Sequence, residues 1–525
     1  MGAVLYFAGP HGMKIRGDII RLYRNVHSWA GITAGLFLFI AFYAGGMTMF
    51  ELPLENWASQ TSKLPAPVPV QSLSELVQKA QASDPSMATA YTLVLHPDAA
   101  SPSSLMWTTS SEKEHGPART IYAGLDPDGS LVTQTRTPSQ AMYFLNILHQ
   151  RIGLPLNREY GRLVMGIVAL LYAVALVSGT IVLLPSLVRN LFALRMTETL
   201  RRVWLDFHTL LGVCSLPFHI VMAASAAGFA FQQPIMALEK TLFLPAAVHQ
   251  SGKGRVHSDH GSQLPLEPMA IVEAFNRQAP DLEADALVYS SRGGKPSLRV
   301  MVQSKAQIVR RPEGGYADMN PYTGRLIATD FLPNHQTSAF QALTLIYALH
   351  FGTYGGWLVR WTYAVLGFGG AFLFYSGNQL WLSARRRRER SEGLTADSFG
   401  TRCLSVLTAG CMIGCVSGIS AVLAAMPFLP EGGHYQTVEA LFYAVLLVCL
   451  LVAMWLGGTR SIGPLLCLAG FLTLLIPITD MARSLMSGSV LHPGLESVTL
   501  LYGIALMVLA LKKRPRQIMG AALTA

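Results

Sequence analysis

The sequence has few charged residues for its length. Of its 525 residues, 40 are Lys or Arg and 30 are Asp or Glu, so charged residues make up 13% of the chain. This is about half the share of a typical soluble protein. Apolar residues make up 51%, and the mean hydropathy is +0.37. The composition excludes a disordered chain, a collagen-like fibre and a compact cytosolic enzyme, and it predicts a membrane protein.

Cysteine is scarce, and the motifs of nucleotide-dependent enzymes are missing. All six cysteines lie in apolar stretches, so we expect no disulfide framework in the polar parts of the chain: Cys214, Cys403, Cys411, Cys415, Cys449 and Cys467. There is no Walker loop, no dinucleotide-binding glycine fingerprint and no nucleophile elbow. A redox function would therefore need an electron donor from outside the chain.

Eight apolar segments approach the roughly 20 residues that a helix needs to cross a bilayer. Short groups of Lys and Arg lie between them, and such groups stay on the cytoplasmic side. The net charge of +10 is thus a topology signal, and we expect no nucleic-acid partner. The spans are expected at about 28–50, 161–185, 204–230, 357–383, 402–428, 438–457, 463–486 and 493–511.

The predicted fold is an all-α transmembrane bundle of about eight helices, with both termini cytoplasmic and two periplasmic α+β modules. Such a chain is a multi-pass protein of a bacterial inner membrane, with the lipid bilayer as its surroundings. The expected order is a cytoplasmic segment (1–27), a span (28–50), module 1 (51–148), an amphipathic segment and span (149–185), a cytoplasmic loop (186–203), a span (204–230), module 2 (231–349), a span (350–383), a basic cytoplasmic loop (384–401), a four-helix membrane region (402–511) and a cytoplasmic tail (512–525).

The order helix, module, helix occurs twice, which indicates an internal duplication. His27 and His208 lie near the inner ends of the first helices of the two copies, 181 residues apart. His149 and His350 follow the two modules, 201 residues apart. Four histidines in repeated positions at membrane boundaries need a physical reason.

Axial ligation of haem iron explains these histidines. An imidazole near hydrocarbon costs free energy unless both nitrogens are satisfied, and an iron bond with a second hydrogen bond satisfies both. We expect two bis-His haem b groups, one held by His27 and His208 and one by His149 and His350. His219 is an alternative outer ligand, because eleven residues of straight helix place it about 16 Å beyond His208 on the same face. A hydrogen-bonded structural histidine is the alternative for each residue.

Several segments resemble the PepSY-associated transmembrane family, over roughly residues 15–385. Turns that are similar to those of PepSY modules occur at Asp126-Pro127 and Asn320-Pro321. The histidine motifs that carry the resemblance are Val26-His27-Ser28-Trp29-Ala30-Gly31, Leu148-His149-Gln150-Arg151, Phe207-His208-Thr209, Leu216-Pro217-Phe218-His219 and Ala348-Leu349-His350.

The resemblance implies an oxidoreductase, namely an inner-membrane ferrisiderophore reductase of the FoxB and FpvG kind. Such a protein carries electrons through haem, reduces an Fe(III)-siderophore in the periplasm and releases Fe(II). Its implied partners are the ferrisiderophore, a quinol or cytoplasmic reductase as the electron donor, and periplasmic siderophore-handling proteins. The C-terminal four-helix region lies outside the resemblance.

Two other classes of function are compatible with the sequence. The modules could act as binding or regulatory domains on a membrane anchor, for a periplasmic partner. The chain could also be a permease, since Asp480 and Arg483 are three residues apart on one face of an expected span, where an ionisable pair can mark a translocation path.

Overall fold

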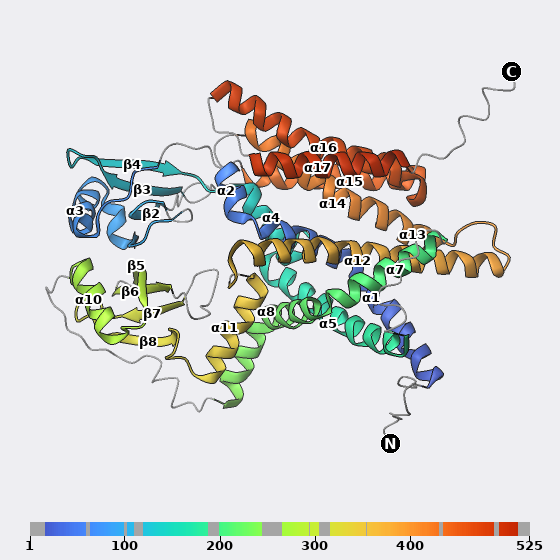
Figure 1. Ribbon diagram of the computed structural model, residues 1–525, viewed down its shortest axis with the longest axis horizontal. Coiled ribbons are helices and arrows are strands. Elements are labelled where there is room, and N and C mark those ends of the chain that lie inside the picture. Colours follow the sequence, from blue (N-terminus) through green and yellow to red (C-terminus); the bar gives the residue numbers. More distant parts are fainter. Residues whose placement is uncertain are drawn as a thin grey trace. The chain divides into compact units, whose positions relative to one another are not determined.

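The computed structural model describes residues 16–58, 64–98, 102–109, 119–186, 199–243, 265–292, 295–303, 315–352, 354–429, 434–487 and 493–512. The chain forms two compact units (Figure 1). The helical unit contains Met1–Glu51, Gln140–Phe231 and Trp361–Ala525, and the sheet unit contains Leu52–Ser139 and Gln232–Arg360. Most of the loop expected at 186–203 and nearly all of the tail expected at 512–525 lie outside the described residues.

The described residues include seven helices that are long and apolar enough to cross a membrane, and eight when α7 and α8 count as one bent span. The prediction of about eight spans is confirmed, whereas the side of the membrane on which each end lies stays a prediction. Helices α13 and α14, with the π-helical turn η4 between them, together form one of these spans, and α4 is too short to be one. The helices of this part of the chain are α1 (Gly17–Thr48), α4 (Gln140–Arg151), α5 (Arg158–Leu183), α7 (Leu200–Cys214), α8 (Leu216–Phe243), α12 (Gly356–Ser391), α13 (Phe399–Leu407), η4 (Thr408–Ile413), α14 (Gly414–Ala425), α15 (Tyr435–Leu456), α16 (Gly458–Ser487) and α17 (Pro493–Lys512).

The third expected span is not one straight helix. Helix α7 ends at Cys214, α8 begins at Leu216, and the two are bent by 69°. Pro217 lies in the first turn of α8, where its missing N–H breaks no hydrogen bond of that helix. The expectation that His208 and His219 share one face of a continuous helix is therefore wrong.

Small residues allow α1 to pack closely against its neighbours. Ala34, Leu38 and Ala41 of α1 form a buried cluster with residues of α5 and α8, among them Tyr172.

The C-terminal helices contain a stripe of glycines that faces α15. Gly410, Gly414 and Gly418 follow one another at intervals of four residues, and a Cβ on any of them would lie within about 3 Å of atoms of α15. Such a stripe is typical of tightly packed membrane helices.

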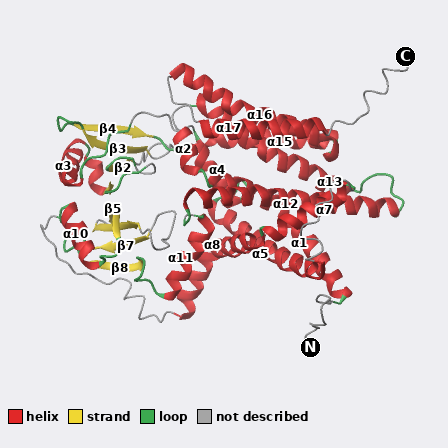
Figure 2. Ribbon diagram, in the orientation of Figure 1, coloured by secondary structure: helices red, strands yellow, loops and turns green. Residues whose placement is uncertain are grey.

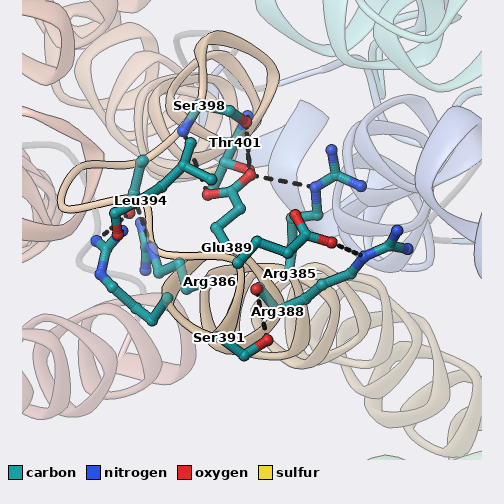
Figure 3. A network of polar contacts seen from close by, with 11 residues as sticks. Arg385, Arg386, Arg388, Glu389, Ser391, Leu394, Ser398 and Thr401 are labelled. Carbon is teal, nitrogen blue, oxygen red and sulfur yellow. Dashed lines mark hydrogen bonds and ion pairs between the residues drawn. The ribbon is translucent and has the colours of Figure 1, made fainter.

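A buried carboxylate holds the connection between α12 and α13 (Figure 3). The side chain of Glu389, which is 3% exposed, accepts hydrogen bonds from Ser398 Oγ, Thr401 Oγ1 at 2.6 Å and Arg385 Nε at 3.2 Å. Ser398 is also the N-cap residue of α13. Around it, Arg386 and Arg390 both bind Asp397, at 2.8 and 2.9 Å. Part of the basic run at residues 385–390 thus also stabilises this turn.

The two α+β modules form a single antiparallel sheet, in which β1 of the first module pairs with β5 of the second. Figure 2 shows the strands of both modules in yellow. The sequence indicated two modules but did not predict this joint. The strand order is β4-β3-β2-β1-β5-β6-β7-β8. The strands are β1 (Ala90–Val94), β2 (Leu105–Thr109), β3 (Arg119–Leu125), β4 (Leu131–Arg136), β5 (Glu283–Arg292), β6 (Lys295–Gln303), β7 (Gly315–Met319) and β8 (Leu326–Phe331).

The joint has approximate twofold symmetry about the pair Leu93 and Leu287. These residues lie opposite each other, and both are fully buried. In the first module Leu93 is in line with Leu105 and Ala123, and in the second Leu287 is in line with Val300 and Ala317. Helices α3 (Leu73–Ser83) and α10 (Pro268–Gln278) pack against this face of the sheet, and their apolar side chains form one hydrophobic core with those of the strands. Both helices agree with the amphipathic pattern of the sequence, which predicts helices over residues 73–82 and 267–277.

The sheet unit also contains α2 (Glu51–Ala58), which begins in the helical unit, and α11 (Ser338–Phe351). The expected Pro/Gly turns are present: Gly129 and Gly324 adopt positive φ values of 81° and 64°, which glycine permits without strain. Their N–H groups donate to the carbonyl oxygens of Asp126 and Asn320. The two turns thus occupy equivalent positions in the two modules, between β3 and β4 and between β7 and β8.

Candidate functional site

His27 and His208 lie beside each other in the helical unit, although 181 residues separate them in the chain. His27 is on α1 and His208 is on α7, and their ring centroids are 6.2 Å apart with an interplanar angle of 74°. The two first helices of the internal repeat thus bring their equivalent histidines together.

Each of these two rings is held through Nδ1 by an acceptor on another helix. Nδ1 of His27 donates to the carbonyl oxygen of Ala175 on α5, at 2.8 Å. Nδ1 of His208 lies 3.2 Å from the carbonyl oxygen of Leu373 and 3.0 Å from Oγ of Ser376, both on α12. A carbonyl only accepts, so the imidazole hydrogen is on Nδ1 and the lone pair is on Nε2. This is the tautomer that an Nε2 metal ligand requires.

A glycine four residues after the carbonyl makes room for each ring. A Cβ on Gly179, four residues after Ala175, would lie 2.8 Å from both Cε1 and Nδ1 of His27. A Cβ on Gly377, four residues after Leu373, would lie 3.3 Å from Cε1 of His208. We call this combination of a carbonyl at position i and a glycine at i+4 a carbonyl–glycine niche.

His149 occupies a third carbonyl–glycine niche, on α1. Its Nδ1 is 2.8 Å from the carbonyl oxygen of Ala41, and a Cβ on Gly45 would lie 2.7 Å from the same nitrogen. His149 lies in the last turn of its own helix α4, within the helical unit. Ala41 follows His27 by fourteen residues on α1, which corresponds to about 21 Å along a helix. The contacts of His149 are therefore well separated along α1 from those of His27.

His219 is held by a side chain instead. Its Nδ1 is hydrogen-bonded to the hydroxyl group of Tyr172 on α5, and its ring centroid is 5.5 Å from that of Phe42 on α1. The residue is fully buried, and its Nε2 has no hydrogen-bond partner in the described part of the chain. Phe42 directly follows Ala41, so His149 and His219 contact neighbouring residues of α1.

His350 lies on α11 in the sheet unit, with its ring centroid 5.4 Å from that of Phe351. The expected pairing of His149 with His350 stays a prediction, as does the choice between His350 and His219. The helical unit brings together His27 and His208. His149 and His219 contact Ala41 and Phe42, which lie further along α1.

The internal repeat extends to these contacts. His27 of the first copy binds α5, and His208 of the second copy binds α12, each through a carbonyl–glycine niche. A family model, the PepSY-associated TM region, matches residues 24–384, more than two thirds of the chain. The chain belongs to the PepSY-associated transmembrane family. No individually curated protein matches it significantly.

The family match includes all five histidines and ends at residue 384, before α13. The C-terminal helices nevertheless contact the histidine region of the family fold. Phe144 of α4 lies 5.2 Å, between ring centroids, from Phe442 of α15, and the Tyr443 hydroxyl donates to the Gly153 carbonyl at 3.3 Å. These contacts brace α4, which carries His149.

The paired histidines fit the axial ligation of a haem. Two imidazoles that bind one metal ion through bonds of about 2 Å place their ring centroids roughly 6 Å apart, and the rings of His27 and His208 are 6.2 Å apart. Among the described residues, no three His, Cys, Asp or Glu side chains gather as a protein-only metal site would require. A haem needs only two ligands from the protein because the porphyrin supplies the others. The buried, unpartnered Nε2 of His219 also suits a metal ligand.

Asp480 and Arg483, the ionisable pair considered for a permease, form an ion pair with each other. Arg483 donates to Asp480 Oδ1 on the same helix, α16, and the side chains are 10% and 2% exposed. Mutual neutralisation accounts for their presence in an apolar helix.

Proposed function

We propose that this protein is a haem-containing membrane oxidoreductase that carries electrons across the bilayer and reduces Fe(III)-siderophores in the periplasm. The observation that carries the proposal is the pair of His27 and His208, whose rings are 6.2 Å apart and whose Nδ1 atoms are bound on two other helices. Membership of the PepSY-associated transmembrane family supports the same function.

The residues of the chain hold and insulate the cofactor. His27 and His208 would bind one haem b, and His149 with His350 or His219 would bind a second. Bound haem supplies a one-electron carrier. The carbonyl–glycine niches fix the tautomer and the orientation of three imidazoles, while Phe42, Tyr172 and Phe374 surround His219 with aromatic rings. Rigid apolar surroundings of this kind keep water from the ligands.

Reduction of a siderophore-bound ion is a release reaction. Hard oxygen donors match small, highly charged Fe(III), and one added electron gives Fe(II), which these donors bind far more weakly. One electron per Fe(III) has to come from a quinol or a cytoplasmic reductase. No acid–base residue of the chain is needed for this step.

The test uses the full chain in lipid vesicles with a quinol analogue or dithionite as the reductant and an Fe(III)-siderophore outside. A chelator specific for Fe(II) reports release. We expect release with the wild-type chain and its loss in both His27→Ala and His208→Ala. Release at the wild-type rate in these variants would refute the proposal, and a protein without haem would favour a membrane-anchored binding or regulatory domain.

A further inference from the structure

His219 differs from the three other histidines of the helical unit in the partner of its Nδ1. His27 and His149 each bind a backbone carbonyl, which can only accept a hydrogen bond. His208 binds the Leu373 carbonyl and Ser376 Oγ, and this hydroxyl donates its own hydrogen to the same carbonyl, so it too accepts from Nδ1. His219 binds the phenol of Tyr172, which can either donate or accept. The partner alone therefore does not fix the tautomer of His219.

The far side of the ring decides between the two arrangements. If Tyr172 donates to Nδ1, the ring hydrogen lies on Nε2, where no described residue accepts it. If Nδ1 donates to the phenol oxygen, Nε2 presents a lone pair to its buried surroundings. A stranded donor in an apolar site is costly, whereas a metal ion that accepts the lone pair satisfies the second arrangement.

The surroundings of the pair are packed so that neither ring can turn easily. Tyr172 is 3% exposed and its ring contacts those of Phe42 and Phe374, with centroids 5.8 and 5.7 Å away. On the other side of His219, a Cβ on Gly370 would lie 3.1 Å from Cε1. The ring contacts hold Tyr172 by its shape, so that the aromatic ring of a phenylalanine would fit the same site.

We propose that Tyr172 is the positioning residue of His219: its oxygen accepts the Nδ1 hydrogen and directs the Nε2 lone pair to a haem iron. This inference rests on the proposed function, and it adds that one haem is tuned by a side chain. A hydrogen-bond acceptor on Nδ1 raises the basicity of the ligand, which favours Fe(III) over Fe(II). Tyr172 thus lowers the reduction potential of the haem bound by His219.

The experiment compares the full-length wild-type chain in detergent with Tyr172→Phe, His219→Ala and the control Tyr375→Phe, whose ring packs against Trp204 and Phe372. Haem content and a redox titration followed by absorbance are measured, together with the electron paramagnetic resonance of the ferric state. We expect one of two transitions in Tyr172→Phe to move to a more positive potential, with haem retention weaker by on the order of 10-fold. The other transition and the Tyr375→Phe protein stay unchanged, and His219→Ala loses the affected haem.

Two results would overturn this role for Tyr172 without touching the proposed function. One is a Tyr172→Phe protein whose two transitions and resonance match the wild type, while His219→Ala lacks one haem. The other is a His219→Ala protein that keeps both haems. A wild-type protein without haem would instead remove the proposed function itself, and the positioning role with it.

Discussion

The ring of His27 fills the space beside the backbone of Gly179, and a Cβ at that position would lie 2.8 Å from both Cε1 and Nδ1. Real Cβ contacts are not this short, so a side chain at position 179 must displace the imidazole. The same reasoning applies at Gly45 and His149, whose closest approach would be 2.7 Å. The niches therefore give a direct way to disturb the histidines without replacing them.

We expect Gly179→Ala to lower the affinity for one haem by about 10-fold or more, the size of effect that follows from disturbing the hydrogen-bonded support of a ligand. Haem quantification on purified protein measures this. The matched control is Gly228→Ala on α8, where the added Cβ would have no described atom within 4 Å apart from its chain neighbours and the backbone of its own helix. Equal haem content in Gly179→Ala and Gly228→Ala would show that the niche does not position His27.

The joint of the two modules depends on Leu93 and Leu287. Leu93→Ala removes a fully buried side chain from the shared core and should lower the free energy of unfolding of the sheet unit by about 3 kcal/mol. Chemical denaturation of the full chain, followed by tryptophan fluorescence, provides the measurement. The control is Thr133→Ala on the exposed face of β4. A Leu93→Ala protein that unfolds together with this control would contradict a shared core.

The stability of the sheet unit should depend on pH through Asp84. Hydrogen bonds from the side chain of Ser86 and from the Trp107 indole, the latter at 2.8 Å, lower the pKa of this carboxyl below its usual value, and the backbone N–H of Ser86 also donates to it at 2.9 Å. Because the pKa of the folded state is lowered, the ionised carboxylate stabilises the fold at pH values above the unfolded-state pKa of about 3.9. This stabilisation is lost as the pH falls through the folded-state pKa. Asp84→Asn should therefore melt earlier than wild type at pH 7, with a difference that narrows towards pH 3. A constant difference would exclude this linkage.

The connection between α12 and α13 offers a comparison of two glutamates, one in the last turn of α12 and one directly after this helix. Glu389 pairs with Arg385 and is 3% exposed, whereas Glu392 pairs with Arg388 and is 50% exposed. Loss of the buried carboxylate strands several donors, while exposed pairs contribute little. Glu389→Ala should lower the melting temperature by several degrees, and Glu392→Ala should not change it measurably. Similar melting curves for the two variants would mean that the buried network does not stabilise the turn.

Much of the membrane architecture follows from the sequence because helix length and hydropathy respond to one physical requirement, the thickness of the bilayer. The eight segments were predicted in this way, and the amphipathic pattern of residues 73–82 and 267–277 predicted α3 and α10. The joint between β1 and β5 could not be predicted, since Leu93 and Leu287 are almost 200 residues apart. The alternation of apolar and polar residues in these two strands is the same as in any other strand and does not indicate which strands pair. Pro217 is the sequence signal for a kink in the third span, but it does not predict the size of the 69° bend at Ser215.

The candidate site was predicted in part. The repeat placed His27 and His208 in equivalent positions, and the structure brings them together. Tyr172 was not predicted, because its link to His219 depends on how α5 packs against α8 and no local motif contains it. The glycines of the niches carried a weak signal: each lies four residues after the residue that binds the ring, a spacing that is common in membrane helices for packing alone.

The absorbance spectrum of the purified full-length chain, produced with ample haem supply, tests the central claim most directly. We predict a Soret band and, on addition of dithionite, split α-bands of low-spin bis-His haem, with roughly half the pigment lost in both His27→Ala and His208→Ala, as expected for about two bis-His sites. A wild-type protein without Soret absorbance, or unchanged pigment in both variants, would contradict the account.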